Sequence, residues 1–201
     1  LTGKIGTVSG TSISFGSENT ISSANITDTG VVYDASAGKA LVVYRDTGNS
    51  SYGTLQALDS SFALTNFTSE SYIGISRGTA FQTGSAASTG TAVVFEAAES
   101  VFLDIAFDSN AGKVVIAYQD NGDSGKGKAI VGTVDPSDNS ISFGTAAEFD
   151  SGNTTRCTIA YDSNAQKVVI AYRDGNNSNY LTAIVGTVSG TSISFGSAVV
   201  A

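Results

Sequence analysis

The twelve-residue phrase GTVSGTSISFGS occurs twice in this chain, at residues 6–17 and 186–197. A looser copy, in which GTV is followed by SISFGT, lies between them at residues 132–145. Self-similarity of this kind is typical of architectures that repeat one supersecondary unit and bury the apolar surface of each unit against its neighbours. The chain is therefore expected to be modular, and residues that recur in every copy are expected to serve the architecture.

A longer unit surrounds the phrase and aligns three times, at residues 31–54, 105–128 and 159–182. Each copy opens with an aromatic–Asp pair, has a Lys five residues after that Asp, and closes with a second aromatic residue that is followed two positions later by Asp. In chain order the recurring residues are Tyr33-Asp34, Phe107-Asp108 and Tyr161-Asp162, then Lys39, Lys113 and Lys167, then Tyr44 and Asp46, Tyr118 and Asp120, and Tyr172 and Asp174.

Each copy predicts four short antiparallel strands. The segment that ends in aromatic–Asp is rich in β-branched and aromatic residues, and the small polar stretch after it predicts a turn. In the strand that follows, Val114, Ile116 and Tyr118 share one face and Val115 and Ala117 the other. Because both faces are apolar, we expect a sheet that is covered on both sides.

The last two strands are predicted in AIVGTV and in the SISFG phrase. SISFG alternates serine with large apolar residues, so we expect the serines to face water. The apolar residues expected to face the core are Ile13 and Phe15, Ile141 and Phe143, and Ile193 and Phe195.

Four strands in a repeat of 54 residues match a propeller blade of roughly 40–50 residues, whereas an immunoglobulin-like sandwich needs about 100. We therefore expect an all-β fold of antiparallel four-stranded repeats that is β-propeller-like, with another repetitive β-sandwich or solenoid fibre as the alternative. Residue 1 falls inside a repeat, so a piece of a longer repeat protein is expected. The expected division, within one continuous domain, is 1–27 as the end of a preceding repeat, 28–100 as repeat 1 with an insertion or divergent segment, 101–153 as repeat 2 and 154–201 as repeat 3.

Charge and composition exclude several classes of function. The net charge of −8, without a run of basic residues, argues against nucleic-acid binding and against attraction to anionic lipid, and no apolar run is long enough for a membrane-spanning helix. With no histidine, the chain lacks the residues of Ser-His-Asp and Cys-His triads and of most zinc sites. The single cysteine, Cys157, excludes an intrachain disulfide and is expected to be a small apolar strand residue. We expect no enzyme activity and no cofactor.

The best candidate sites are three equivalent Asp-containing loops at 46–50, 120–124 and 174–178. Their aspartates can stabilise turns through Asx hydrogen bonds, or hold calcium through hard oxygen ligands. Only Asp120 with Asp123 offers two carboxylates for calcium, and no terminal bidentate Glu completes that motif. The aspartates of the aromatic–Asp pairs are expected to cap the junction between strand and turn.

The same loops are candidates for glycan binding, since tyrosines expected to be exposed follow them and can stack on sugars. The alternative is that these tyrosines pack on their own repeat. The candidate ligand residues are Asp46, Asn49, Tyr52, Asp174, Asn177 and Tyr180. Sequons that could accept N-linked glycans occur at Asn25, Asn49, Asn66, Asn153 and Asn176.

The segment YDSNAQKVVIAYRDGNNSNYLTAIVGTVSGTSISFGS resembles a tandem repeat of very long proteins from phage and environmental sequences, which are described as tail-fibre-like or surface-fibre proteins with propeller-like repeats. A second segment, LTNFTSESYIGIS, is similar in part to another element of those proteins. Its matching residues are Leu64, Thr65, Tyr72, Ile73 and Gly74. The resemblance covers about three quarters of the chain and implies an extracellular or virion location, and it carries no catalytic residues to transfer.

Three functions follow as expectations. The first is a structural and adhesive repeat module of an extracellular or virion fibre, whose partners are neighbouring repeats or copies of itself and which can self-assemble through sheet edges. The second is a glycan-binding propeller that recognises cell-surface glycans. The third is a glycoside hydrolase that uses Asp120 and Asp174, although carboxylates repeated in every unit argue for a structural role.

Overall fold

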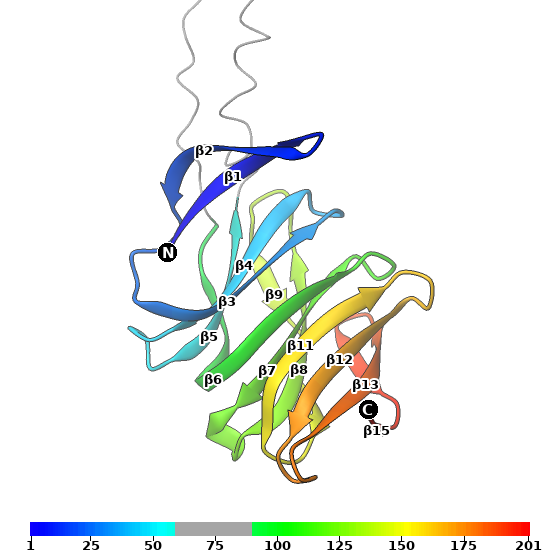
Figure 1. The fold of residues 1–201 in the computed structure, drawn as a ribbon. Coiled ribbons are helices and arrows are strands. Elements are labelled where there is room, and N and C mark those ends of the chain that lie inside the picture. Colours follow the sequence, from blue (N-terminus) through cyan, green and yellow to red (C-terminus); the bar gives the residue numbers. More distant parts are fainter. Residues whose placement is uncertain (59–89) are drawn as a thin grey trace, which may run out of the picture.

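A computed structural model describes residues 1–58 and 90–201 of the chain (Figure 1). Its regular elements are antiparallel β-strands and a single 3₁₀ turn, η1 (Asn121–Asp123), so the predicted all-β class is confirmed. No helix in these two ranges is long and apolar enough to span a membrane. The fibre-like segment with Leu64, Thr65, Tyr72, Ile73 and Gly74, and the sequon at Asn66, lie outside the described residues.

The strands form a two-stranded pair followed by three units. The pair consists of β1 (Thr2–Ser9) and β2 (Ser12–Thr20). Unit 1 consists of β3 (Ile26–Asp34), β4 (Lys39–Asp46), β5 (Tyr52–Leu58) and the first part of β6 (Val93–Asp108). Unit 2 consists of the second part of β6, β7 (Lys113–Asp120), β8 (Lys126–Val134), β9 (Ile141–Phe143) and β10 (Ala147–Asp150). Unit 3 consists of β11 (Thr154–Asp162), β12 (Lys167–Asp174), β13 (Tyr180–Ser189), β14 (Ser192–Phe195) and β15 (Val199–Val200).

Each unit is an antiparallel sheet in the predicted order. In unit 3 the path is β11-β12-β13-β14, and β15 also pairs with β13. The registers of the first two strands agree between units, because Val31 lies opposite Val42, Ile105 opposite Ile116 and Ile159 opposite Ile170. The three-fold alignment of the sequence therefore corresponds to a structural repeat of antiparallel strands.

Strand β6 belongs to two units. It pairs with β5 as far as Glu99 and with β7 from Ser100 onward. The predicted boundary between residues 100 and 101 lies next to this change of partner. One continuous strand therefore closes unit 1 and opens unit 2, and its first part pairs with β5 at the positions where β10 pairs with β8 in unit 2.

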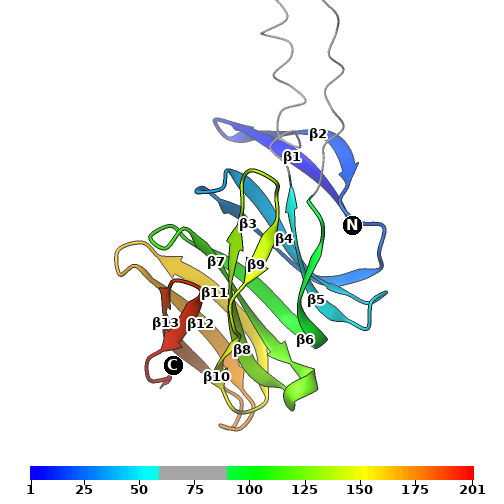
Figure 2. The ribbon, with the colours of Figure 1, turned by 180° about the vertical axis from the view of Figure 1, so that it is seen from behind.

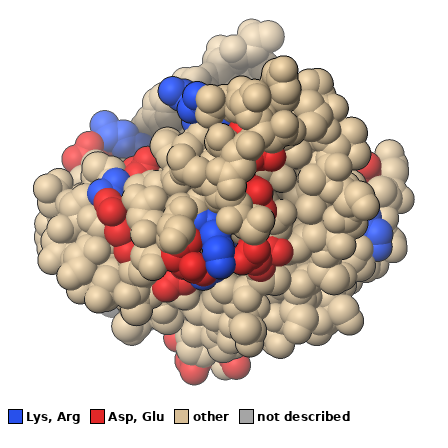
Figure 3. Space-filling view, turned by 90° about the horizontal axis from the view of Figure 1, so that it is seen from below, with Lys and Arg blue, Asp and Glu red and all other residues tan. Residues whose placement is uncertain are grey.

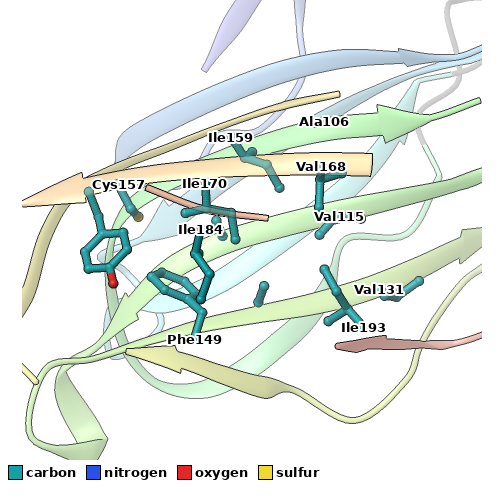
Figure 4. Close-up of a cluster of buried hydrophobic side chains, with 13 residues drawn as sticks. Ala106, Val115, Val131, Phe149, Cys157, Ile159, Val168, Ile170, Ile184 and Ile193 are labelled. Atoms are coloured by element: carbon teal, nitrogen blue, oxygen red, sulfur yellow. The ribbon is translucent and has the colours of Figure 1, made fainter. Parts of the chain in front are cut away.

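Successive units bury their apolar faces against each other. We call the face that carries Val114, Ile116 and Tyr118 in unit 2 the front face, and the face that carries Val115 and Ala117 the back face. The back face of unit 1 and the front face of unit 2 form one core, and the back face of unit 2 forms a second core with the front face of unit 3 (Figure 4). The expectation of a sheet covered on both sides is therefore confirmed for unit 2.

A phenylalanine–glycine pair recurs at both of these cores. The ring of Phe95 lies over Gly53 in unit 1, and the ring of Phe149 lies over Gly127 in unit 2, so closely that a Cβ on either glycine would overlap the ring. Each ring then meets the front-face tyrosine of the next unit, at 5.2 Å between the centroids of Phe95 and Tyr118 and 5.2 Å between those of Phe149 and Tyr172. The glycines are needed here because a side chain would occupy the space of the ring.

The units follow one another in chain order, with β1–β2 at one end and unit 3 at the other (Figures 1 and 2). The first strands of successive units, β3, β6 and β11, lie side by side. The described strands thus form an open succession of stacked sheets.

The predicted inward orientation of the SISFG residues holds for two of the three copies. Ile141 and Ile193 are buried, and Phe143 and Phe195 pack against the cores. The prediction is wrong for Ile13 and Phe15, which are 56% and 64% exposed. The physical reason is that β1 pairs only with β2 among the described strands, so no sheet in front of the pair covers these side chains.

Matched substitutions at one repeat position test whether the stacked faces stabilise the fold. Ile159→Ala, in the core between units 2 and 3, is expected to lower the free energy of unfolding by about 3 kcal/mol, because it leaves a cavity. Val31→Ala removes the equivalent side chain from unit 1, where it is exposed, and is expected to change stability by less than about 0.5 kcal/mol. Urea unfolding of both variants measures the difference, and equal losses would contradict the assignment of the core.

Candidate functional site

The three Asp loops connect equivalent strands: β4 to β5, β7 to β8 and β12 to β13. In each loop the Asp carboxylate accepts a hydrogen bond from a backbone N–H two residues later. These bonds are 2.9 Å from Gly48 to Asp46, 2.9 Å from Gly122 to Asp120 and 3.0 Å from Asn176 to Asp174. The predicted role in turn stabilisation by Asx hydrogen bonds is confirmed.

The two carboxylates proposed for calcium are bound by lysines. Lys128 Nζ lies 2.8 Å from Asp120 Oδ2 and 2.9 Å from Asp123 Oδ2, and Lys126 Nζ lies 3.3 Å from Asp123 Oδ1. Lys126 also pairs with Glu148 at 3.2 Å. Figure 3 shows basic atoms set among acidic ones at this end of the molecule. A calcium ion would have to displace both ammonium groups, so calcium at Asp120 and Asp123 stays a prediction that this geometry disfavours.

The ion pairs shift the pKa values of their members. Hydrogen bonds from Lys128 and Lys126 lower the pKa of Asp123. Burial opposes the charged form of Lys128, but its hydrogen bonds to Asp120 and Asp123 outweigh burial and raise the pKa of the ammonium. The stabilisation from Asp123 is therefore present above the ordinary pKa of an Asp and is lost as the pH falls through the lowered value. In residues 1–58 and 90–201, no group of three or more His, Cys, Asp or Glu side chains could hold a metal ion.

Residues 99 and 153, which are one repeat of 54 residues apart, join the loops of successive units. Glu99 accepts hydrogen bonds from Arg45 at 2.8 Å and from Asn121 at 3.2 Å, so it links the end of β4 in unit 1 to the Asp loop of unit 2. The side chain of Asn153 accepts a bond from Gln119 at 2.8 Å, and its backbone oxygen accepts one from Gly175 N at 2.9 Å. Sequence analysis missed this link, and the 54-residue spacing is the signal that could have revealed it.

The candidate glycan-binding residues differ in accessibility. Tyr180 is 56% exposed, whereas Tyr52 is half-buried, so the expectation that both are exposed is wrong for Tyr52. Tyr52 lies opposite Glu99 of β6, whereas among the described strands Tyr180 pairs only with Asp174 of β12. Asn49 and Asn177 are exposed, and Asp46 and Asp174 have their carboxylates engaged in their turns. The sequon asparagines that the structure describes are all exposed: Asn25, Asn49, Asn153 and Asn176.

The aspartates of the aromatic–Asp pairs cap the strand-to-turn junctions, as predicted. In each unit the carboxylate accepts bonds from the backbone N–H groups two and three residues later. The pairs of bonds are from Ser36 and Ala37 to Asp34, from Asn110 and Ala111 to Asp108, and from Asn164 and Ala165 to Asp162. These repeated carboxylates therefore have a structural duty in every unit.

The first strands carry a second repeated device that the sequence did not reveal. Each has a β-bulge at the same place, where Asp28, Phe102 and Arg156 adopt positive φ values of 49°, 53° and 53°. Next to two of these bulges, Asp104 accepts bonds from Thr158 Oγ1 at 2.6 Å and Ile159 N at 2.9 Å, which ties β6 to β11. Three different residue types occupy the bulge, so no motif marks it.

Cys157 is a buried strand residue, as predicted. Its thiol donates to the backbone oxygen of Phe102 at 2.7 Å, and burial, together with the charge of Asp104, raises its pKa to about 12. The thiol is therefore protonated near neutral pH and lacks the thiolate character of a nucleophile.

In the part of the chain that the structure describes, the apolar front face of unit 1 and the apolar back face of unit 3 are each partly exposed. On the front face of unit 1, Val31 is 68% exposed, whereas the equivalent Ile105 and Ile159 are 5% and 7% exposed. On the back face of unit 3, Val185 is 46% exposed, whereas the equivalent Val131 is fully buried. The same repeat positions are thus buried inside the succession and exposed at its ends.

Comparison with known proteins adds no relative to this picture. No protein-family model, curated protein or solved structure matches the chain. The functional argument therefore rests on the molecule's own surfaces.

Removal of one capping carboxylate tests whether it stabilises the turn. Asp108→Ala is expected to lower the free energy of unfolding by about 1–3 kcal/mol, because Asp108 is buried and two backbone hydrogen bonds to it are lost. Asp162→Ala removes the same bonds at an exposed site, where water can replace them, and is expected to cost less. Urea unfolding compares the two variants, and a larger loss for Asp162→Ala would contradict the explanation.

The ion pairs of unit 2 are tested by Lys128→Met. The Asp120 side chain is only 4% exposed, and leaving this buried carboxylate without its counter-ion is expected to cost about 3 kcal/mol of stability at neutral pH. Lys126→Met serves as the control, because Lys126 pairs with more exposed carboxylates, and its cost is expected to stay below about 1 kcal/mol. Thermal and urea unfolding measure both changes, and a stable Lys128→Met variant would show that the pair contributes little.

Proposed function

We propose that this chain is a structural repeat module of a fibre that is displayed outside the cell or on a virion. The observation that carries the proposal is that like units stack through their apolar faces and that the apolar face at each end of the described array stays partly exposed. Exposed apolar faces of this kind mark interaction surfaces in soluble proteins. A surface poor in charge and rich in Ser, Thr, Asn and Gly, together with the resemblance to tail-fibre-like and surface-fibre repeats, supports the location.

The propeller-like arrangement belongs to this proposal. Its support is that the first strands of the units lie side by side and that each sheet packs its back face on the front face of the next. In a propeller, blades meet face to face in this way around a common axis.

Glycan binding is the second candidate, and it would make the module adhesive. The observation that favours it is the exposed ring of Tyr180, which follows a loop in which Asn176 and Asn177 are also exposed. An exposed aromatic ring beside amide groups can stack on a sugar and bond to its hydroxyls. A glycan array tests this function, with Tyr180→Ala as the variant expected to lose any signal. An array without a bound glycan removes the candidate.

Immunoelectron microscopy of the native source tests the structural role. Antibodies raised against this chain are expected to label fibres on virions or on the cell surface. Preimmune serum is the control for unspecific labelling. Label confined to the cell interior, or to dispersed protein without fibres, would contradict the proposal.

A further inference from the structure

The β1–β2 pair occupies the position of the outer strands of a unit in front of unit 1. Residues 1–17 and 181–197 are identical except at three positions, 3–5 and 183–185. The pairing agrees as well, because Ile21 N donates to Leu1 O at 2.9 Å just as Ala201 N donates to Leu181 O at 2.9 Å. Strand β13 is paired on both sides within unit 3, whereas β1 has one edge without a partner among the described strands.

This pair covers only part of the front face of unit 1. Leu1 and Ile21 pack on a small core of Val42, Tyr44 and Leu58, while Val31 and Tyr33 on β3 remain exposed. A complete unit would cover β3 as well, as units 1 and 2 cover Ile105 and Ile159 in the units that follow them. The front face of unit 1 is therefore a seat that the pair fills incompletely.

The back face of unit 3 has the chemistry that fits this seat. At the positions where units 1 and 2 have the glycine–phenylalanine pairs, unit 3 has Leu181 and Ala201, and the β1–β2 pair has Leu1 and Ile21. Leu181 is thus the equivalent of the residue that already packs on the seat. The exposed part of this back face also presents Val169, Ala183, Val185 and Val199, and Arg173 lies directly opposite Leu181 on the same face.

We propose, on the basis of the structural role above, that unit 3 of one copy docks on unit 1 of a second copy and displaces its β1–β2 pair. The interface repeats the contact between units 2 and 3 within one chain. Because the two surfaces differ, the association is heterologous and continues from copy to copy. The β1–β2 pair then acts as a removable cover of the seat. Its displacement costs free energy, so it raises the protein concentration at which copies associate.

Two singly blocked variants test the docking by sedimentation velocity. The wild-type chain is expected to form a concentration-dependent series of species without a fixed end size. Val31→Lys blocks the seat and Val185→Lys blocks the back face of unit 3, so each variant alone is expected to remain monomeric. Both residues are exposed in the single chain, so both variants are expected to fold. Mixed together, they retain one intact surface each and are expected to form a 1:1 heterodimer that grows no further.

Val200→Lys is the matched control. Val200 is 48% exposed, close to Val185, but it lies opposite Thr182 and points to the other side of the sheet, at the position where unit 2 has Glu148. This variant is expected to associate like the wild type. A Val31→Lys variant that still dimerises alone would show that two back faces pair with each other, and it would overturn the head-to-tail arrangement.

The variant Ile21→Ala tests whether the β1–β2 pair is a removable cover of the seat or a fixed part of it. Weaker packing of the pair on Tyr44 and Leu58 is expected to let association begin at a several-fold lower concentration. Association that needs a higher concentration instead would overturn the displacement. A wild-type chain that stays monomeric, with no heterodimer in the mixture, would overturn the docking itself, while labelled fibres in the native source would leave the structural role standing.

Discussion

The fold depends on the burial of one sheet's back face against the next sheet's front face. Neither face of a unit can be satisfied within its own sheet, because alternate residues of its central strands are apolar in both directions. Stability in such an array is close to a sum over neighbouring contacts, and the terminal units are the weakest places. Hydrogen bonds through Glu99, Asn153 and Asp104 connect adjacent units around this apolar contact, while the capping aspartates fix the turns within each unit.

Much of this architecture could be predicted from the sequence. The strand order, the two apolar faces and the capping aspartates follow from residue patterns that recur in each copy, because every copy obeys the same local physics. The orientation of Ile13 and Phe15 could not be predicted in this way, since exposure depends on whether a neighbouring sheet is present. The shared strand β6 also escaped prediction, because its first part lies outside the three aligned copies and corresponds to β10 of unit 2, with Phe95 at the position of Phe149.

The candidate loops show why a local motif is weak evidence for a ligand. The motif at Asp120 and Asp123 contains two carboxylates and a glycine, which are features of calcium loops. The decisive residues, Lys126 and Lys128, lie on the following strand, where units 1 and 3 have Tyr and Thr. The pairing partner of a carboxylate across a hairpin is set by register, and register becomes visible only when the strands are placed.

The glycine–phenylalanine pairs restrict how the sequence of the repeat can evolve. The ring of Phe149 fills the volume that a side chain at position 127 would need, so neither position can mutate alone without overlap or a void. The combination of Leu181 with Ala201 in unit 3 is a second solution to the same packing problem. Units that carry different solutions are not freely interchangeable, because each back face is shaped for its neighbour. The two positions of each pair are therefore expected to change together in evolution, which restricts the order of the units when copies of the repeat are gained or lost.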